Sequence, residues 1–440
     1  IKNTLSVTIE DVMNVYNKYI KDKNYIATSF VPRNGKDLAL SNATEAIIKE
    51  EKIIIGAEEN FDASIAAKYE KTPSSFDRSV EPPYGNAPEV KVPEVWESTL
   101  ENGLKVYGVQ SDEVPLVQFN LVIDGGQLLE SIDKLGVANL TADLMEKGTK
   151  SKTVSELEDA LAQLGASVNI FSGRESIRIS GTTLAKNYNA TLALAKEMLL
   201  EPRWDETEFD LLKKRAINNL RQQEASPRSV AANAYNKLIY GKDNIRSKNV
   251  LGTMESVNAI TIDDLKTYYN SYISPSVAKM HVVGDISKDN VVTSLKGLEN
   301  DWASKDVTIP SFKTPDAPKK STVYFYDIPN AKQSQLSFGA PALAFNDADY
   351  YPATVMNYIL GGGGFASQLT QQLREGKGYT YGIGSRFSGT KDKGSFTIGS
   401  GVRSNVTLEA SLLVKQILTN YPKNYNEKVT LELSKPWVRN

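Results

Sequence analysis

The residues whose types and spacing could do chemistry lie between Leu360 and Phe387. This stretch reads LGGGGFASQLTQQLREGKGYTYGIGSRF, with Arg374 and Tyr381 seven residues apart. A guanidinium and a phenol brought together could both donate hydrogen bonds to one peptide carbonyl. The spacing therefore predicts a pair of donors that grips a peptide group.

A glycine run, a helix and a strand must position these two donors. The run consists of Gly361, Gly362, Gly363 and Gly364. We expect a helix of about three turns after it, with Leu369 and Leu373 on one face at i, i+4. Gly376 and Gly378 then stop the helix, and residues 379–381 begin an alternating strand.

The same stretch allows two other interpretations. A glycine run before a helix also suggests a phosphate loop, but that loop ends in Gly-Lys-Ser/Thr ahead of the helix. Here Gly376-Lys377 follows the helix and precedes Gly378, which argues against nucleotide binding. A purely structural alternative stays open, in which Arg374 complements the helix dipole and Tyr381 packs on the core.

The composition excludes several classes of protein. The 440 residues predict two or three domains, and 40% hydrophobic and 24% charged residues are ordinary globular values. A net charge of −2 favours neither nucleic acid nor an anionic membrane. No run approaches the roughly 18 apolar residues of a membrane-spanning helix.

Cysteine and histidine counts limit the chemistry further. The chain has no cysteine and one histidine, His281. Thiol catalysis, disulfides and zinc-thiolate sites are excluded, and a catalytic zinc normally needs two or three histidines. We interpret His281, in the alternating segment AKMHVVGDI, as a packed strand residue.

An internal repeat relates residues 7–32 to residues 260–285. Both copies open with Thr-x-x-Asp, continue as an amphipathic helix and pass into an apolar strand. The identical pairs are Thr8/Thr261, Ile9/Ile262, Asp11/Asp264, Tyr16/Tyr269, Asn17/Asn270, Tyr19/Tyr272 and Ile20/Ile273. Because the second copy closes a complete domain, we expect residues 1–33 to be the tail of a preceding homologous domain.

The rest of the chain predicts a linker and two α+β domains. We expect an extended linker at 34–93, with a short helix at 43–52 and five later prolines. A complete domain follows at 94–307, and a second, truncated one at 316–440. Expected strands lie at 104–109, 116–123, 176–182, 322–326 and 334–338. Expected helices lie at 136–145, 153–164, 189–200, 206–223 and 351–360, covering one face of each sheet.

The segment GVANLTADLMEKGT, residues 136–149, resembles the active-site helix of the insulinase/pitrilysin zinc metallopeptidases, which include the mitochondrial processing peptidase. That helix carries an inverted His-x-x-Glu-His motif between a Gly-x-Ala start and a Lys-Gly-Thr end. The frame matches here, but the chemical residues do not. Asn139 and Asp143 stand at the two histidine positions, Ala142 at the general base, and Asn219 at the third ligand. The resemblance therefore implies no catalytic zinc on this chain.

The resemblance also implies an architecture and a function. Family members are paired halves of a clamshell, each with two homologous α+β domains, a mixed or antiparallel sheet covered by helices. The half without zinc supplies an Arg and a Tyr seven residues apart, as Arg374 and Tyr381 are here. We expect a zinc-less C-terminal half that binds peptide substrates beside a zinc-bearing half, without a membrane span and without nucleic acid.

Three versions of this function stay open. The zinc-bearing half stands upstream on the same polypeptide, which the repeat at residues 1–33 favours, or on a separate partner subunit. In the third version the chain is a non-catalytic scaffold subunit of a complex. The substrate, cleavage preference, compartment and oligomeric state are left undetermined.

Overall fold

The computed structural model describes residues 6–32, 34–42, 44, 75, 77, 80, 92–329 and 331–424. By their contacts the residues divide into two units, Ile1–Tyr84 and Gly85–Asn440. Most of the predicted linker at 34–93, with its short helix at 43–52, lies outside the described residues. Among the described helices, none has the length and apolar content needed to cross a bilayer.

The first unit contains the helix predicted by the repeat. Helix α2 (Ile9–Tyr19) begins at a capping box, in which the Thr8 hydroxyl accepts from the Asp11 backbone and the Asp11 carboxylate accepts from the Thr8 backbone. Thr261 and Asp264 form the same capping box at helix α9 (Ile262–Tyr272). Residues 23–32 form no strand, because a lone segment finds no partner for its backbone groups. The helical part of the repeat is confirmed.

The second unit begins with a six-stranded mixed sheet in the order β1-β2-β6-β3-β5-β4. The first three strands are β1 (Trp96–Thr99), β2 (Lys105–Gln110) and β3 (Leu116–Asp124). The others are β4 (Ser167–Ser172), β5 (Ser176–Leu184) and β6 (Ala278–Gly284). Strand β6 lies between β2, to which it is parallel, and β3, to which it is antiparallel.

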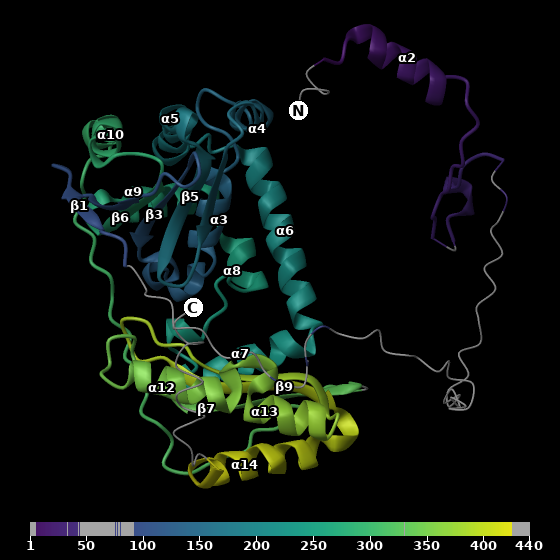
Figure 1. Cartoon of the computed structure of the whole chain (residues 1–440), viewed down its shortest axis with the longest axis vertical. Helices are drawn as coiled ribbons and strands as arrows, with labels where there is room; N and C mark the ends of the chain where they lie inside the picture. Colours follow the sequence, from purple (N-terminus) through teal and green to yellow (C-terminus); the bar gives the residue numbers. More distant parts are fainter. Residues whose placement is uncertain are drawn as a thin grey trace. The chain divides into compact units, whose positions relative to one another are not determined.

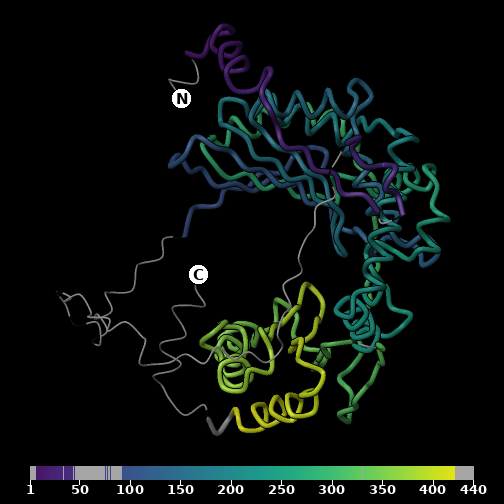
Figure 2. The backbone as a smooth tube through the Cα atoms, turned by 90° about the vertical axis from the view of Figure 1, so that its right-hand side faces the viewer, coloured from purple at the N-terminus to yellow at the C-terminus, as the bar shows by residue number. Residues whose placement is uncertain are grey.

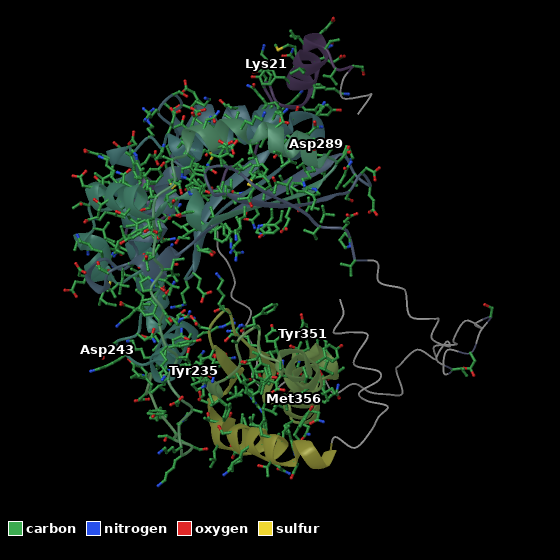
Figure 3. All side chains as sticks on the ribbon, turned by 90° about the vertical axis from the view of Figure 1, so that its left-hand side faces the viewer. Lys21, Tyr235, Asp243, Asp289, Tyr351 and Met356 are labelled. Atoms are coloured by element: carbon green, nitrogen blue, oxygen red, sulfur yellow. The ribbon has the colours of Figure 1, made fainter. Side chains whose placement is uncertain are left out.

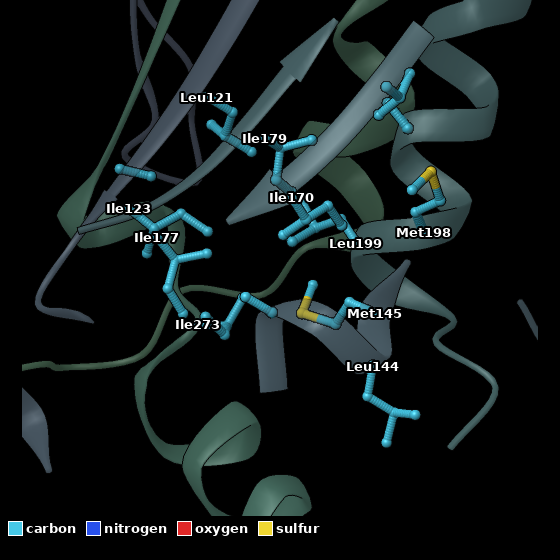
Figure 4. Close-up of a cluster of buried hydrophobic side chains, with 14 of the residues drawn as sticks. Leu121, Ile123, Leu144, Met145, Ile170, Ile177, Ile179, Met198, Leu199 and Ile273 are labelled. Carbon is cyan, nitrogen blue, oxygen red and sulfur yellow. The ribbon is translucent and has the colours of Figure 1, made fainter. Parts of the chain in front are cut away.

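Helices cover one face of this sheet, as Figure 1 shows. They are α3 (Val137–Met145), α4 (Val154–Gln163), α5 (Tyr188–Leu200), α6 (Glu206–Glu224), α8 (Met254–Ala259), α9, α10 (Lys288–Ser294) and α11 (Lys296–Asp301). Every second strand residue points into the core beneath them, so that Ile170, Ile177 and Ile179 meet Met145 and Met198 (Figure 4). The α+β layout with helices over one face is confirmed.

The opposite face of the sheet carries polar side chains, and it corrects one prediction. His281 is exposed on this face and stacks on Tyr107 with ring centroids 5.7 Å apart. The prediction that His281 is packed in the core is therefore wrong. Alternation explains the error, because Met280 and Val282 on either side take the two inward positions.

A second, three-stranded sheet has the order β7-β9-β8. Its strands are β7 (Gln333–Pro341), β8 (Thr380–Phe387) and β9 (Ser395–Arg403). Helices α12 (Tyr350–Asn357), α13 (Gln368–Thr370) and α14 (Thr407–Asn424) accompany it. In Figure 2 this part of the backbone runs from green to yellow. Its core joins Leu360, Leu369 and Leu373 to Ile398 and Val414.

The glycine run lies at the end of one helix and in the turn before the next. The expectation placed it as a hinge at the start of a helix. Helix α12 continues as a π-helical segment through Gly362, and Gly364 then turns with φ +58°. The next helix begins after Ser367 and closes as a π-helical segment at Gly376. Leu369 and Leu373 are fully buried on one face, as their spacing predicts.

The predicted strand at 322–326 is absent. These residues are assigned to no strand, and Val323 and Phe325 are 94% and 87% exposed. The predicted strand at 334–338 is present within β7.

Helix α7 (Pro227–Tyr240) and the β8–β9 loop join the two sheets. The Tyr235 hydroxyl donates to the Phe396 carbonyl at 3.2 Å, and Figure 3 labels this tyrosine. Arg246, 5% exposed, forms ion pairs with Glu175 at 3.0 Å and with Asp392 at 2.7 Å. Three neighbours of Asp392 in the loop also bond to residues that precede β7. These contacts are Thr390 to Glu175, Lys391 to Asp124, and the Lys393 carbonyl to Thr314.

Candidate functional site

The degenerate zinc helix α3 is anchored at its N-terminus by a buried carboxyl group. Glu130 accepts from the backbone N–H groups of Gly136 at 3.0 Å and Ala138 at 2.8 Å. Burial raises the pKa of Glu130 to about 8, against the opposing effect of these two hydrogen bonds. Gly136 has φ +98°, and a Cβ there would lie 2.7 Å from the Leu251 carbonyl oxygen. The Gly-x-Ala start therefore fixes where this helix begins.

An ion pair joins α3 to α6 at one of the expected zinc-ligand positions. The Asp143 carboxylate accepts from the Arg215 guanidinium at 2.9 Å. Burial raises the pKa of Asp143, and the nearby Arg215 partly opposes that rise. Ala142, in the general-base position, is fully buried and has no group that exchanges a proton.

The remaining two positions carry amides. Asn139 is half-buried on α3, and Asn219 is exposed on α6, one turn after Arg215. Asn219 lines a shallow depression with Gln222, Gln223, Ser229 and Leu251.

These residues do not fit a catalytic zinc. Zinc sites use thiolate, imidazole and carboxylate ligands, and the only such ligand here is Asp143, which already neutralises a guanidinium. The described part of the chain holds no cluster of three or more potential metal-ligating side chains.

Arg374 lies at the end of the helix that begins after Ser367. Its guanidinium carbon lies 4.4 Å from the centre of the Phe365 ring, a cation–π contact. It also pairs with the Glu375 carboxylate at 2.9 Å, and its side chain is 32% exposed. These contacts hold the guanidinium near the surface with donors left for a further partner.

Tyr381 lies on a β-bulge of β8. Thr380 pairs with Val402 and Ile383 with Ser400, so β8 has one more residue than β9 across this interval. The Thr380 hydroxyl accepts from the Gly382 backbone at 3.0 Å, which stabilises the bulge. Tyr381 is 91% exposed. A core-packing role for Tyr381 is therefore wrong, and bulges of this kind redirect side chains near functional sites.

Arg374 and Tyr381 lie on consecutive elements, the helical segment that ends at Gly376 and strand β8. The Gly378 backbone donates to the Arg374 carbonyl at 2.9 Å, and the Tyr379 backbone donates to Leu373 at 2.9 Å. The turn between helix and strand is therefore short and hydrogen-bonded. In the part of the chain that the structure describes, no hydrogen bond joins Arg374 to Tyr381 directly.

Sequence reasoning missed four residues that shape these sites. Arg215 could have been found as the cation four residues before Asn219 on one helix face. Phe365 follows the glycine run, and Glu375 follows Arg374, but neither position has a spacing signal. Glu130 lies six residues before Gly136 and has no sequence pattern either.

Comparisons with known proteins identify the family of the chain. The model of the family "Insulinase (Peptidase family M16)" matches residues 106–248, and that of the "Peptidase M16 inactive domain" matches residues 259–429. The two matches together span most of the chain. The degenerate zinc helix falls within the first match, and Arg374 and Tyr381 fall within the second.

Individual relatives show the same relationship. The chain is 24% identical to the "Uncharacterized zinc protease YmxG" of Bacillus subtilis, over 78% of this chain and 82% of that protein. It is 27% identical to the "Non-peptidase homolog YmxG" of Helicobacter pylori, over 68% and 66%.

A solved structure shares the fold. The peptidase M16 inactive domain from Pseudomonas fluorescens superposes with a TM-score of 0.74 at 23% identity, over 79% of this chain and 84% of that one. The two sheets with their covering helices, the degenerate zinc helix and the two family matches lead to one conclusion. The chain belongs to the insulinase family, peptidase family M16.

Proposed function

We propose that this chain is the zinc-less, substrate-binding half of an M16 metallopeptidase that cleaves peptides when combined with a zinc-bearing half. The observation that carries the proposal is the contrast between its two candidate sites. The expected zinc positions carry two amides and one carboxylate, whereas Arg374 and Tyr381 have the expected spacing and reach the surface. A subunit that has lost only its metal chemistry is expected to retain its substrate contacts.

In this proposal Arg374 and Tyr381 donate to the carbonyl group of a bound peptide. The scissile oxygen gains negative charge during hydrolysis, and donors held in advance stabilise that charge. The guanidinium stays protonated at every relevant pH, and Phe365 and Glu375 restrict its orientation. The zinc half supplies the attacking water and the general base.

A second candidate function is a non-catalytic scaffold subunit. It is favoured by the Helicobacter pylori relative, which is named a non-peptidase homolog. The two candidates differ in what they require of the surface around Arg374. A scaffold has no need to bind an extended peptide there.

Peptide binding by the chain itself tests the proposal. Fluorescein-labelled β-casein, which is largely unstructured, is titrated with the chain and followed by anisotropy. We expect saturable binding that Arg374→Ala weakens about tenfold, as for loss of a charge-assisted hydrogen bond. Lys377→Ala, three residues away, is the matched control and should bind like the parent. Equal binding by parent and Arg374→Ala would contradict the proposed role of this arginine.

A further inference from the structure

A cavity of about 530 Å³ lies between the first sheet and the helices α5, α10 and α11. Small-molecule pockets in proteins have volumes of roughly 300–1,000 Å³. Strands β3, β5 and β6 and helix α5 supply its apolar lining, which includes Phe119, Leu121, Ile179, Leu192, Leu199 and Met280. These side chains are buried, and Figure 4 shows Leu121, Ile179 and Leu199 among the core residues. The cavity therefore reaches from the surface into the core.

Tyr188, the first residue of α5, brings a polar atom into this apolar space. Its side chain is 1% exposed, and its ring meets Phe119 edge to face with ring centroids 6.2 Å apart. Among the described residues, its hydroxyl has one partner, the Ser294 hydroxyl, which donates to it at 3.5 Å. Ser294 has a single hydrogen to donate, and the Val291 carbonyl accepts it at the shorter distance of 2.7 Å.

The phenol hydrogen of Tyr188 is consequently a buried donor for which the described residues provide no acceptor. Buried polar groups are normally paired, and leaving one unpaired opposes folding. An acceptor oxygen on a molecule bound in the cavity would satisfy this hydrogen. The cavity thus suits a ligand that is mostly apolar and carries a hydrogen-bond acceptor.

The rim of the cavity is polar, and its charges disfavour an anion. Three exposed, uncharged side chains contribute to it, Asn189, Asn290 and Thr293. Lys196 is also at the rim, but its ammonium group pairs with the Asp301 carboxylate. The Asp285 carboxylate forms an ion pair with none of the described residues, so it leaves a negative charge at the rim. A carboxylate on the ligand would be repelled by this charge.

We propose that this cavity binds a neutral amphiphile, an acyl ester with a hydroxylated head such as a monoacylglycerol. The lining is mainly leucine, isoleucine and methionine, which suits a flexible acyl chain. In this arrangement the ester carbonyl accepts from the Tyr188 phenol, and the head hydroxyls meet the amide and hydroxyl groups of the rim. Burial of the chain supplies most of the affinity. This inference is independent of the proposed peptidase role, which uses none of these residues.

Calorimetric titration of the chain with 1-decanoylglycerol, kept below its critical micelle concentration, tests the site. We expect saturable one-to-one binding by the parent. Tyr188→Phe keeps the ring but removes the donor, and its affinity should fall about fivefold, as for one hydrogen bond. Decanoate, the anionic counterpart, should bind the parent at least about tenfold more weakly than the ester because of charge repulsion and desolvation.

Two variants that obstruct the mouth show whether the ligand enters this cavity. Ala193→Trp on α5 and Thr293→Trp on α10 each place an indole at an exposed position of the rim, so the core is left intact. Each should lower the affinity by more than about tenfold, because the acyl chain loses access to apolar surface. Ala190→Trp, exposed on α5 but outside the lining, is the matched control and should bind like the parent.

Each result bears on a separate part of the proposal. A parent that shows no saturable binding, or binding that neither Ala193→Trp nor Thr293→Trp weakens, would overturn the site. Decanoate that binds as tightly as the ester would overturn the neutral class of ligand. Equal affinities for the parent and Tyr188→Phe would overturn the role of the phenol. The melting temperature of each variant is measured alongside, to show that the chain is folded.

Discussion

At the scale of single residues, Asp143, at one of the expected zinc-ligand positions, takes part in a polar contact between two helices. Arg215 on α6 brings a fixed positive charge to the Asp143 carboxylate on α3. A guanidinium stays protonated in a protein and has no free lone pair. It therefore cannot bind a metal ion, as a neutral histidine can. The contact that a metal would make between these helices is made here by an ion pair.

Metal content follows from these residues. We expect the chelator-treated chain, after incubation with zinc and dialysis into zinc-free buffer, to hold no stoichiometric zinc. Atomic emission measures the zinc content. Arg215→Ala is an informative control, because it frees Asp143 without adding a ligand and should gain no zinc. One zinc per chain that survives dialysis would contradict the assignment of the ligand positions.

Glu130 makes stability depend on pH. Its pKa is raised from 4.5 to about 8, so the folded chain binds a proton more tightly than the unfolded chain. The stability that this proton brings is fully present below pH 4.5 and is lost as the pH rises through 8. The free energy of unfolding should fall by up to about 1.4 kcal/mol per pH unit in that window.

Urea unfolding of the parent and Glu130→Gln from pH 5 to pH 8.5 measures this effect. The glutamine keeps an acceptor for one of the two backbone N–H groups but does not titrate. We expect a flatter pH profile for the variant. Glu158→Gln, on exposed α4, should keep the parent's profile. Parallel profiles for parent and Glu130→Gln would show that Glu130 is not the titrating group.

At the scale of elements, the glycine run is a close-packed turn. A Cβ at Gly361 would lie 2.4 Å from the Ser385 hydroxyl and 2.7 Å from Leu369. Ser385 itself bonds to buried Asn357. Only glycine allows the helix to pass β8 this closely, and this approach sets the position of the next helix and of Arg374 at its end.

Substitution at Gly361 tests this packing. Gly361→Ala should lower the free energy of unfolding by about 1–3 kcal/mol, the usual cost of overpacking. Gly399→Ala on β9, where a Cβ meets nothing within 4 Å, is the matched control and should change stability by less than about 0.5 kcal/mol. If the two alanine variants are equally stable, the turn is not close-packed.

Many helix starts and strand positions could be predicted from the sequence, because capping residues and alternating apolar residues within each segment determine them. The Thr153 and Thr261 capping boxes are present as expected, and alternation placed β3 and β5 to within a few residues. The strand expected at 322–326 shows the limit of such signals. Its pattern is that of a strand, but a strand needs a partner, and alternation in one segment does not report whether the partner is there.

The contacts at the sites could not be predicted in the same way. Arg215 meets Asp143 across 72 residues of sequence, and Arg246 meets Asp392 across 146. The bulge that exposes Tyr381 comes from unequal residue counts on two strands. These features depend on how elements pack, which no single segment encodes.

At the scale of the whole molecule, a polar contact around Arg246 joins the two sheets of the second unit. This guanidinium is buried and pairs with Glu175 and Asp392. The Arg174 guanidinium donates hydrogen bonds to the backbone carbonyls of Arg246 and Lys248. Loss of one member of a buried charge cluster leaves the others unpaired.

Arg246→Ala should therefore cost about 2 kcal/mol, less than the roughly 3–5 kcal/mol of wholly buried pairs because both carboxylates reach solvent. Calorimetry should show the part of the chain around β7–β9 unfolding at a lower temperature than in the parent. Arg228→Ala, at an exposed position on α7, is the control. A single unchanged transition in Arg246→Ala would show that this contact does not couple the two sheets.

In the proposed function, Arg374 and Tyr381 bind a peptide on this chain alone, and they stabilise the charge of the scissile carbonyl oxygen once a zinc-bearing half is present. Placing donors on one half and the metal on the other would couple chemistry to closure around a bound peptide. The chain alone is expected not to cleave peptides, since Ala142 has no group that accepts a proton and the ligand positions do not fit zinc.

Turnover of a quenched fluorescent peptide by the chain combined with a zinc-bearing M16 half tests this claim most directly. We predict that the combination cleaves the peptide and that a chelator stops it. Arg374→Ala and Tyr381→Phe should each lower kcat by about 10²–10³, with zinc content and Tm unchanged. Hydrolysis by the chain alone in the presence of chelator, or both variants within about threefold of the parent, would contradict it.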